Sequence, residues 1–428
     1  MAVIVTPEHP QRSSRPLISA IIRKLKIRLH PSSKKQPKTT SAPEAEPADD
    51  PRPPLNSSWL PLVLKEHQHT LSQLGWTTIT FPQFTSPNHA LENRADIPPN
   101  DSHPLQRASA DLFAAAQLFF DQPDEAKRAW KHRLGTEEGW SKVEGEKEFI
   151  TLRTLEYTPD VLKEAAERYW RLMVGSEGGE GYLRNVVKRV EGSLGLPHHT
   201  PKPNPLLQFL PPTPSIPQTD AEKTASMIRI FRYTLSSSTP SPAPTPPQPQ
   251  PQLPTQEPVS IVAEPHADLG LLSVVTGDVP GLEVWNGQCF VDIERHYVRS
   301  GAHAATMLVG RQLEMFSNKR YGAGGHRVPA PDTNATSTQN DKPEPAPKYR
   351  HSIVFVLRAH EPVPLDSRDL ESAITGKWDD QSFKGNVTAG EVYERIRNAH
   401  YNINIGKEER ERQKRGVEER RKREAAGS

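Results

Sequence analysis

Met227-Ile-Arg-Ile-Phe-Arg-Tyr233 marks the point at which the pattern of the sequence changes. Apolar residues alternate with arginine across it, which is typical of a half-buried β-strand. Before this stretch, apolar residues recur mainly at the three- and four-residue spacing of helices, whereas short apolar runs separated by glycine or proline follow it. The first half of the chain is therefore predicted to be mainly helical and the second half mainly strand.

Further strand candidates follow Tyr233 at short intervals. They lie at 259–263, 271–275, 282–284, 290–293, 304–309, 313–316 and 352–357. Together with the strand that ends at Tyr233 they make eight short strands, and this number and spacing favour a jelly roll or a related barrel. The predicted fold class is α+β, with a jelly-roll core and flanking helices.

The helices are expected mostly upstream of this core. The first ends at Gly75 and leads into a strand at 76–81, and Pro159 suits the first position of another. A last helix begins at the capping box Thr388-x-x-Glu391. The predicted helices span about 62–74, 105–120, 159–173 and 182–194, and the last lies within 376–405.

Composition divides the chain into segments. Its 428 residues include 44 prolines, about twice the usual ~5% share, and Pro-rich stretches cannot bury enough apolar surface to offset their ordering entropy. We predict a disordered basic and Pro-rich tail at 1–57, a helical entry module at 58–196, a strand-rich core at 197–405 and a charged tail at 406–428. Two Pro-rich inserts, at 236–258 and 329–348, are interpreted as surface loops.

Charge and cysteine content exclude several classes of function. The formal charge of +2, from 54 basic and 52 acidic residues, gives no global field that would attract nucleic acid or an anionic membrane. The single cysteine, Cys289, excludes an intramolecular disulfide and a thiolate zinc site, and no apolar run approaches the roughly 18 residues of a membrane span. We expect a cytoplasmic monomer, with a mitochondrial presequence in the basic, Ser-rich segment 11–41 as the alternative.

His266-Ala-Asp268 has the spacing of a metal site at the end of a predicted strand. Residues i and i+2 of a strand point to the same face, so this imidazole and carboxylate can converge on one ion. His326, in the Gly-rich stretch 321–328, is the best third ligand because glycine allows close backbone approach. A chance His-x-Asp is expected in roughly half of such chains, and a lone histidine is more often structural. Two histidines and one carboxylate with open positions nevertheless suit a non-haem Fe(II) oxygenase.

Arg350-His-Ser352 begins the apolar strand that ends at Leu357. An arginine there can hold a carboxylate with two parallel hydrogen bonds, and Ser352 faces the same side and can donate another. Taken alone, an exposed arginine at the start of a strand is the commoner interpretation. In combination with the metal motif, the pair predicts an anchor for an acidic cosubstrate.

From about Trp59 to Ile405 the sequence resembles the isopenicillin N synthase-like Fe(II)- and 2-oxoglutarate-dependent dioxygenases. The resemblance rests on ordered motifs, namely His266-Ala-Asp-Leu-Gly-Leu-Leu272, Pro280-Gly-Leu-Glu-Val284, Leu313-Glu-Met-Phe-Ser-Asn-Lys-Arg-Tyr321, His326-Arg-Val328 and Arg350-His-Ser-Ile-Val-Phe355. It implies a double-stranded β-helix whose His266, Asp268 and His326 bind Fe(II). It also implies that Arg350 and Ser352 bind the distal carboxylate of 2-oxoglutarate.

Several positions depart from the family pattern. Tyr233 matches a tyrosine that contacts the cosubstrate, but the asparagine usual two residues earlier is Phe231 here. Ala267 stands where threonine is common, and Gly310-Arg311 replaces a Gly-Asp pair. The gap from His326 to Arg350 is longer than usual, which a loop absorbs at little energetic cost.

The resemblance implies an enzyme that uses Fe(II), 2-oxoglutarate and O2 to hydroxylate or desaturate a small organic molecule, such as a secondary metabolite, with succinate and CO2 as coproducts. Trp140, Phe149, Trp285 and Tyr401 are conceivable substrate contacts, although each also suits the core. The alternatives are a catalytically silent oxygenase-like scaffold for protein interaction, an iron oxidase of the same fold that does not use 2-oxoglutarate, and a cupin-like metal protein without need of the Arg350 anchor.

Overall fold

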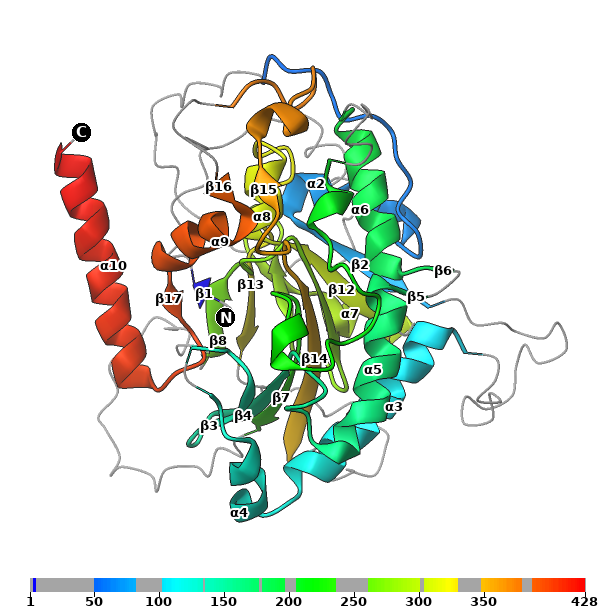
Figure 1. Ribbon diagram of the computed structural model, residues 1–428, viewed down its shortest axis with the longest axis vertical. Coiled ribbons are helices and arrows are strands. Elements are labelled where there is room, and N and C mark those ends of the chain that lie inside the picture. The colour runs from blue at the N-terminus through cyan, green and yellow to red at the C-terminus, as the bar shows by residue number, and fades with distance from the viewer. Residues whose placement is uncertain are drawn as a thin grey trace, which may run out of the picture.

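The computed structural model describes most of the predicted entry module and core. The residues described are 3–4, 50–81, 102–133, 135–176, 179–196, 205–235, 261–300, 304–329, 348–378 and 387–427. Two antiparallel sheets lie at the centre, and helices flank them (Figure 1). This arrangement confirms the predicted α+β fold with a jelly-roll, double-stranded β-helix core.

The larger sheet has seven strands and runs through the middle of the molecule. Its central strand β14 (Tyr349–Leu357) pairs with β9 on one side and β7 on the other, in continuous register on both. The outer strands extend the sheet in both directions. In spatial order the strands are β2 (Trp76–Thr80), β12 (Ala304–Val309), β9 (Leu272–Gly277), β14, β7 (Met227–Thr234), β4 (Lys147–Leu152) and β3 (Gly139–Val143).

The smaller sheet has four strands and supplies the histidines of the predicted metal site. Its order is β11 (Phe290–Asp292), β10 (Glu283–Trp285), β13 (His326–Pro329) and β8 (Ile261–His266). The register of β13 and β8 places His326 directly opposite His266. A pairing between strands that are distant in sequence therefore brings these two side chains together.

Helices cover the outer face of the larger sheet. In α5 (Asp160–Val174), Tyr169 and Trp170 are fully buried and make edge contacts with Phe355 of β14, with ring centroids 6.3 and 5.1 Å apart. Burial of large aromatic rings removes a large apolar area from water and so stabilises the packing of α5 on the sheet. The helices α3 (Pro104–Phe120) and α6 (Tyr182–Ser193) pack beside α5 (Figure 1). This layer fixes the sheet from behind and leaves its other face toward β8 and β13.

The remaining elements are short, apart from the C-terminal helix. They are β1 (Val3–Ile4), η1 (Lys65–His67), α2 (Thr70–Leu74), α4 (Asp124–Lys127), η3 (Arg128–Trp130), β5 (Gly175–Ser176), β6 (Gly179–Glu180), η4 (Leu207–Phe209), η5 (Asp220–Glu222), α7 (Ile293–Ser300), α8 (Arg311–Phe316), β15 (Pro364–Leu365), η6 (Ser367–Leu370), β16 (Val387–Thr388), α9 (Ala389–Asn398), β17 (Tyr401–Asn402) and α10 (Lys407–Gly427). The predicted capping box is confirmed, because Thr388 and Glu391 exchange hydrogen bonds at the start of α9.

Some sequence predictions were wrong in detail. The strand predicted at 313–316 is helix α8, because Leu313 and Phe316 share one buried helical face and the backbone N–H of Arg311 donates to Asp268 O at 2.8 Å. Strands β3 and β4 lie within the region predicted to be helical. Pro159 is the N-cap of α5 and not its first helical residue.

The predicted tails differ in part from the structure. Residues 50–57, assigned to the N-terminal tail, contact the domain: Arg52 Nη1 donates to Asn318 O and Thr375 O at 3.0 and 2.8 Å. At the other end, Val417 of α10 is buried against Tyr401 and Ile403. The basic segment 11–41, the insert 236–258 and residues 330–347 of the second insert lie outside the described residues.

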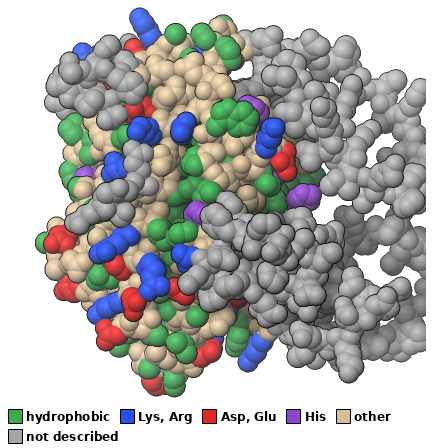
Figure 2. Space-filling model, turned by 90° about the vertical axis from the view of Figure 1, so that its right-hand side faces the viewer, with side chains coloured by type: hydrophobic (Ala, Val, Ile, Leu, Met, Phe, Trp, Pro, Cys, Tyr) green, Lys and Arg blue, Asp and Glu red, His purple; other side chains and the backbone are tan. Residues whose placement is uncertain are grey.

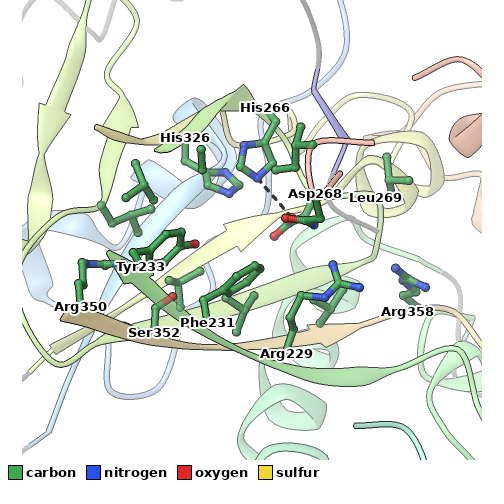
Figure 3. A pocket seen from close by; sticks show the side chains of 18 residues that line it. Arg229, Phe231, Tyr233, His266, Asp268, Leu269, His326, Arg350, Ser352 and Arg358 are labelled. Atoms are coloured by element: carbon green, nitrogen blue, oxygen red, sulfur yellow. Dashed lines mark ion pairs between the residues drawn. The ribbon is translucent and has the colours of Figure 1, made fainter. Parts of the chain in front are cut away.

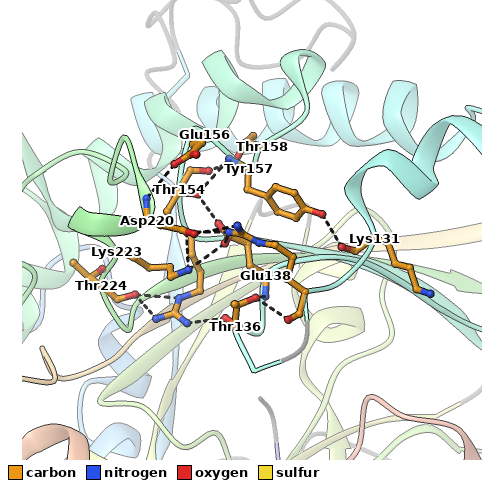
Figure 4. A network of polar contacts seen from close by, with 12 residues as sticks. Lys131, Thr136, Glu138, Thr154, Glu156, Tyr157, Thr158, Asp220, Lys223 and Thr224 are labelled. Atoms are coloured by element: carbon orange, nitrogen blue, oxygen red, sulfur yellow. Dashed lines mark hydrogen bonds and ion pairs between the residues drawn. The ribbon is translucent and has the colours of Figure 1, made fainter.

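A buried polar network fixes the loop before β3 against the loop before β7 (Figure 4). The carboxylate of Glu138 is fully buried, accepts a hydrogen bond from Thr154 Oγ1 at 2.7 Å and pairs with Arg133. Lys223 reaches the same carboxylate at 3.5 Å and also pairs with Asp220. A buried charge without a partner is costly, so Glu138 must keep these contacts. They therefore hold the edge of the larger sheet in one arrangement.

The surface on the side of α3 and α5 carries acidic and basic side chains next to one another (Figure 2). Arg168 pairs there with Asp111 and Glu164. Interspersed charges of this kind create little net field. None of the described helices is both long enough and apolar enough to cross a membrane.

Candidate metal centre and pocket

The structure brings His266, Asp268 and His326 together. His266 ends β8, Asp268 follows two residues later, and His326 begins β13. One potential ligand atom from each lies within 4.8 Å of the others, and the three side chains are buried. His266 Nε2 and Asp268 Oδ1 are 4.0 Å apart. The geometry is that of a cluster able to hold one metal ion.

Backbone carbonyls orient both imidazoles. His266 Nδ1 donates to Glu264 O at 2.8 Å, and His326 Nδ1 donates to Gly324 O at 3.1 Å. With the proton on Nδ1, each ring keeps its Nε2 lone pair for a metal, which is the usual arrangement around ligating histidines. Among the described residues, Asp268 Oδ2 is buried without a hydrogen-bond partner. A cation would satisfy this orphaned oxygen.

The electrostatics of the cluster favour its metal-binding protonation states. Burial, together with the neighbouring His326, lowers the pKa of His266 to about 3, so the ring is neutral at physiological pH. Burial by itself would raise the pKa of Asp268, but His326 and His266 outweigh it and hold the pKa below its usual value. Neutral imidazole and ionised carboxylate are the forms that bind metal. The residues therefore fit Fe(II), which two histidines and one carboxylate hold with positions left open.

A cavity extends from this cluster along the inner face of the larger sheet (Figure 3). Its empty volume, with the open mouth included, is about 620 Å³. Strand alternation selects its lining, because every second residue of a strand faces the same side. The residues that these two strands contribute are Arg229, Phe231 and Tyr233 from β7 and Arg350, Ser352, Val354 and Val356 from β14, with Arg358 directly after β14.

Arg350 lies at one end of the cavity in a closely fitted site. Its Nη2 donates to Glu294 Oε2 at 2.8 Å and its Nε donates to Val279 O at 3.0 Å. A Cβ on Gly277 or Gly281 would lie 2.8 or 2.7 Å from the guanidinium nitrogens, so glycine makes room for this side chain. Burial would lower the pKa of Arg350, but Glu294 raises it above its usual value. The guanidinium is therefore charged, and its orientation is set before any ligand arrives.

Tyr233 and Ser352, the other two predicted cosubstrate residues, lie beside Arg350. The Arg350 guanidinium lies 5.6 Å from the centroid of the Tyr233 ring, and Ser352 is buried on the same face of β14. Burial raises the pKa of Tyr233 to about 12, so its hydroxyl keeps its proton. Phe231 stacks on Tyr233 with centroids 5.4 Å apart. The residue that departs from the family pattern thus extends the apolar floor of the cavity.

Sequence reasoning missed four residues of this region. Glu294 orients Arg350, and the cavity is also lined by Arg229, Arg358 and Asn404. Strand alternation was the signal that could have found the two arginines, because residues an even number of positions apart face the same side of a strand. Arg229 is four positions from Tyr233, and Arg358 is eight positions from Arg350. The conceivable substrate contacts do not line this cavity: Trp140, Phe149, Trp285 and Tyr401.

Comparison with protein families agrees with this geometry. Residues 225–359 match the family model of the 2OG-Fe(II) oxygenase superfamily. No curated protein matches the chain. Similar solved structures include a full-length protein of Neurospora crassa in complex with alpha-KG and 5-formyluracil, with 15% identity over 77% of this chain and 87% of that chain and a TM-score of 0.47. A putative 2OG-Fe(II) oxygenase family protein of Caulobacter crescentus has 16% identity over 78% and 93% and a TM-score of 0.47. The rice dioxygenase for auxin oxidation has 19% identity over 76% and 86% and a TM-score of 0.42.

Proposed function

Residues 225–359 belong to the 2OG-Fe(II) oxygenase superfamily, and on this premise we propose the specific roles of the site in an enzyme that uses Fe(II), 2-oxoglutarate and O2. His266, Asp268 and His326 hold the iron, and Arg350, Ser352 and Tyr233 hold 2-oxoglutarate. The reaction is hydroxylation or desaturation of a small organic molecule, with succinate and CO2 as coproducts. The observation that carries the proposal is the buried triad, whose atoms lie within 4.8 Å of one another, at a cavity that ends on a buried arginine.

Bound iron and 2-oxoglutarate supply the oxidising power, and the side chains of the chain position the reactants. Glu294 and Val279 fix Nη2 and Nε of Arg350, so the guanidinium presents its remaining edge in a set direction. A carboxylate there gains charge-assisted hydrogen bonds without a further cost in side-chain entropy. The protonated hydroxyls of Ser352 and Tyr233 add donors beside it. The apolar side chains Phe231 and Val354 exclude water from the space between this anchor and the triad.

The proposal is tested by anaerobic titration of the Fe(II)-loaded protein with 2-oxoglutarate, followed through the weak visible charge-transfer band of the chelate. The band is expected in the wild-type protein and is expected to be lost in His326→Ala. The exposed His69 gives a matched control, because His69→Ala removes an imidazole outside the site. An equal band in both variants would contradict the assignment of His326 as a ligand.

The same titration separates the alternatives. Iron binding without a chelate band would favour an iron oxidase of the same fold that does not use 2-oxoglutarate. Failure to bind iron would favour a catalytically silent scaffold. Asp268 Oδ2 is buried and has no hydrogen-bond partner in the described part of the chain. This weighs against the scaffold, because such an atom costs free energy unless a ligand satisfies it.

A further inference from the structure

The cavity has a second cationic end, which the proposed roles of iron and 2-oxoglutarate do not use. Arg229 and Arg358 line it, with exposed fractions of 5% and 3%. Figure 3 shows the two arginines on the side of Phe231 away from Arg350 and Ser352, with Asp268 above Arg229. The triad therefore lies between two separate groups of buried arginine.

The positive charge at this end is only partly compensated. Arg358 Nη1 donates to Glu137 Oε2 at 2.7 Å, and Arg358 Nε is buried without a partner among the described residues. Arg229 Nε donates to the neutral Thr151 Oγ1 at 2.8 Å, and its Nη2 contacts Met227 Sδ at 3.5 Å. Within the described ranges, Arg229 forms no ion pair with a carboxylate. Arginine does not lose its proton in proteins. With Glu137 counted against Arg358 and Asp268 assigned to the metal, the described residues leave about one uncompensated positive charge at this end.

Asn404 adds an independent sign that a polar ligand binds here. It lines the same cavity from the segment between β17 and α10, and it is 7% exposed. Its Nδ2 and Oδ1 are both buried without hydrogen-bond partners in the described part of the chain. A buried polar group without a hydrogen-bond partner destabilises the fold. A ligand that accepts hydrogen bonds would satisfy Asn404 Nδ2 and the two arginines together.

We propose that Arg229, Arg358 and Asn404 form the substrate subsite and bind a carboxylate of the substrate. A monoanion matches the single uncompensated charge, whereas a phosphate dianion would exceed it. The apolar part of the substrate lies over Phe231, Val356 and Ile403, which line the cavity near the triad. The inference rests on the proposed function and narrows its substrate class to apolar carboxylic acids.

The test compares carboxylic acids with their own primary amides, which have nearly the same shape without the charge. The probes are phenylacetate with phenylacetamide and hexanoate with hexanamide, titrated by calorimetry into the full chain loaded anaerobically with Fe(II) and 2-oxoglutarate. A charge-assisted contact contributes about 1.5–3 kcal/mol, so an acid is expected to bind at least about 10-fold more tightly than its amide. In Arg229→Gln this preference is expected to fall to about 2-fold or less, and Arg229→Lys is expected to keep part of it.

Arg232→Gln is the matched control, because Arg232 lies on the same strand but on the other face, where it pairs with Glu148. Glu148 keeps its partner Lys127 at 2.7 Å in that variant. If Arg229→Gln does not fold, Asn404→Ala on the other wall tests the same subsite and should also reduce the preference. Equal binding of acid and amide in the wild-type protein, or an undiminished preference in the folded Arg229 and Asn404 variants, would overturn the inference.

The chelate band tests the proposed function, and the acid preference tests the subsite, so the two can fail separately. The 2-oxoglutarate chelate band is recorded before any probe is added. Its absence would overturn the proposed function. The subsite would still be decided on the metal-free protein, where the acid preference should fall in Arg229→Gln and not in Arg232→Gln. A normal band with no acid preference would overturn the subsite alone.

Discussion

Gly324→Ala is predicted to weaken metal binding although Gly324 is not a ligand. Its carbonyl oxygen accepts the hydrogen bond that orients His326, at 3.1 Å from Nδ1. An added Cβ would lie 2.1 Å from Gly75 O, whereas ordinary contacts begin at 3.4 Å. Gly75 cannot easily move away, because its carbonyl accepts from Val309 N at 2.8 Å and Gly324 N donates to Val309 O at 2.9 Å. The segment that carries His326 must therefore shift by more than about 1 Å if the methyl group is to fit.

The size of the effect follows from these contacts. Loss of a hydrogen bond that orients a ligand typically reduces metal affinity 10–100-fold, which is about 1.4 to 2.8 kcal/mol. Overpacking costs a further 1–3 kcal/mol or so of fold stability. The assay is anaerobic calorimetry with Fe(II), together with urea unfolding of the metal-free protein. These two measurements separate the loss of the metal site from a general loss of the fold.

Gly322→Ala is the control, because a Cβ at Gly322 would meet no atom within 4 Å. It changes the same Gly-rich stretch by the same methyl group, so its effect on iron affinity is expected to be below about 3-fold. Equal iron affinity in the two variants would refute the argument that close packing of Gly324 on Gly75 positions His326.

Three further predictions concern the cosubstrate anchor, a buried amine and the polar network. Arg350→Lys keeps the charge but loses the planar fork, so we expect about 10–100-fold weaker 2-oxoglutarate binding in the chelate titration, and unchanged binding would contradict the anchor. Burial lowers the pKa of Lys147 to about 7 in the folded protein, so above pH 7 the unfolded state binds more protons than the folded state. The free energy of unfolding should therefore rise from pH 7 to pH 9, by up to about 1.4 kcal/mol per pH unit. Urea unfolding of the wild-type protein and of Lys147→Met checks this, and a difference in unfolding free energy between the two proteins that stays constant with pH would contradict it. Glu138→Ala leaves the buried Thr154 hydroxyl without its acceptor and should cost about 1–3 kcal/mol in the same assay, so a loss under about 0.5 kcal/mol would show that the network is not stabilising.

The sequence was sufficient where the signal was local. Alternation predicted β7, and a continuous apolar run predicted β14. His266 was placed at a strand end two residues before Asp268, so two of the three metal ligands followed from strand geometry. The contact between His326 and His266 depends on the pairing of β13 with β8, which no local period encodes. The Gly-rich stretch around His326 suggested the third ligand, and the resemblance to the family supported it.

The sequence was insufficient where charged residues are buried, because a charged residue ordinarily predicts an exposed position. All six residues of β4 are buried, and Lys147 and Glu148 stand among them, so the strand shows no alternation of polar and apolar residues. Arg229 and Arg358 are charged residues in and beside strands, which ordinarily predicts a solvated face. Here that face lines a cavity, and only the assembled sheets show it.

The position of Arg350 is independent of the length of the Pro-rich insert that precedes it. Strand β14 pairs with β7 over eight residues, Tyr349–Val356, and with β9 over six, Ser352–Leu357. A slip of one residue would turn every cavity-facing side chain of β14 away from the triad, and it would disrupt both ladders at once. The register therefore places Arg350 near the start of β14 and Val354 four residues further, opposite Arg229, roughly 13 Å along the strand at 3.3 Å per residue. This separation keeps the two anion-binding ends distinct, and a longer or shorter insert should leave both of them, and the triad between them, in place.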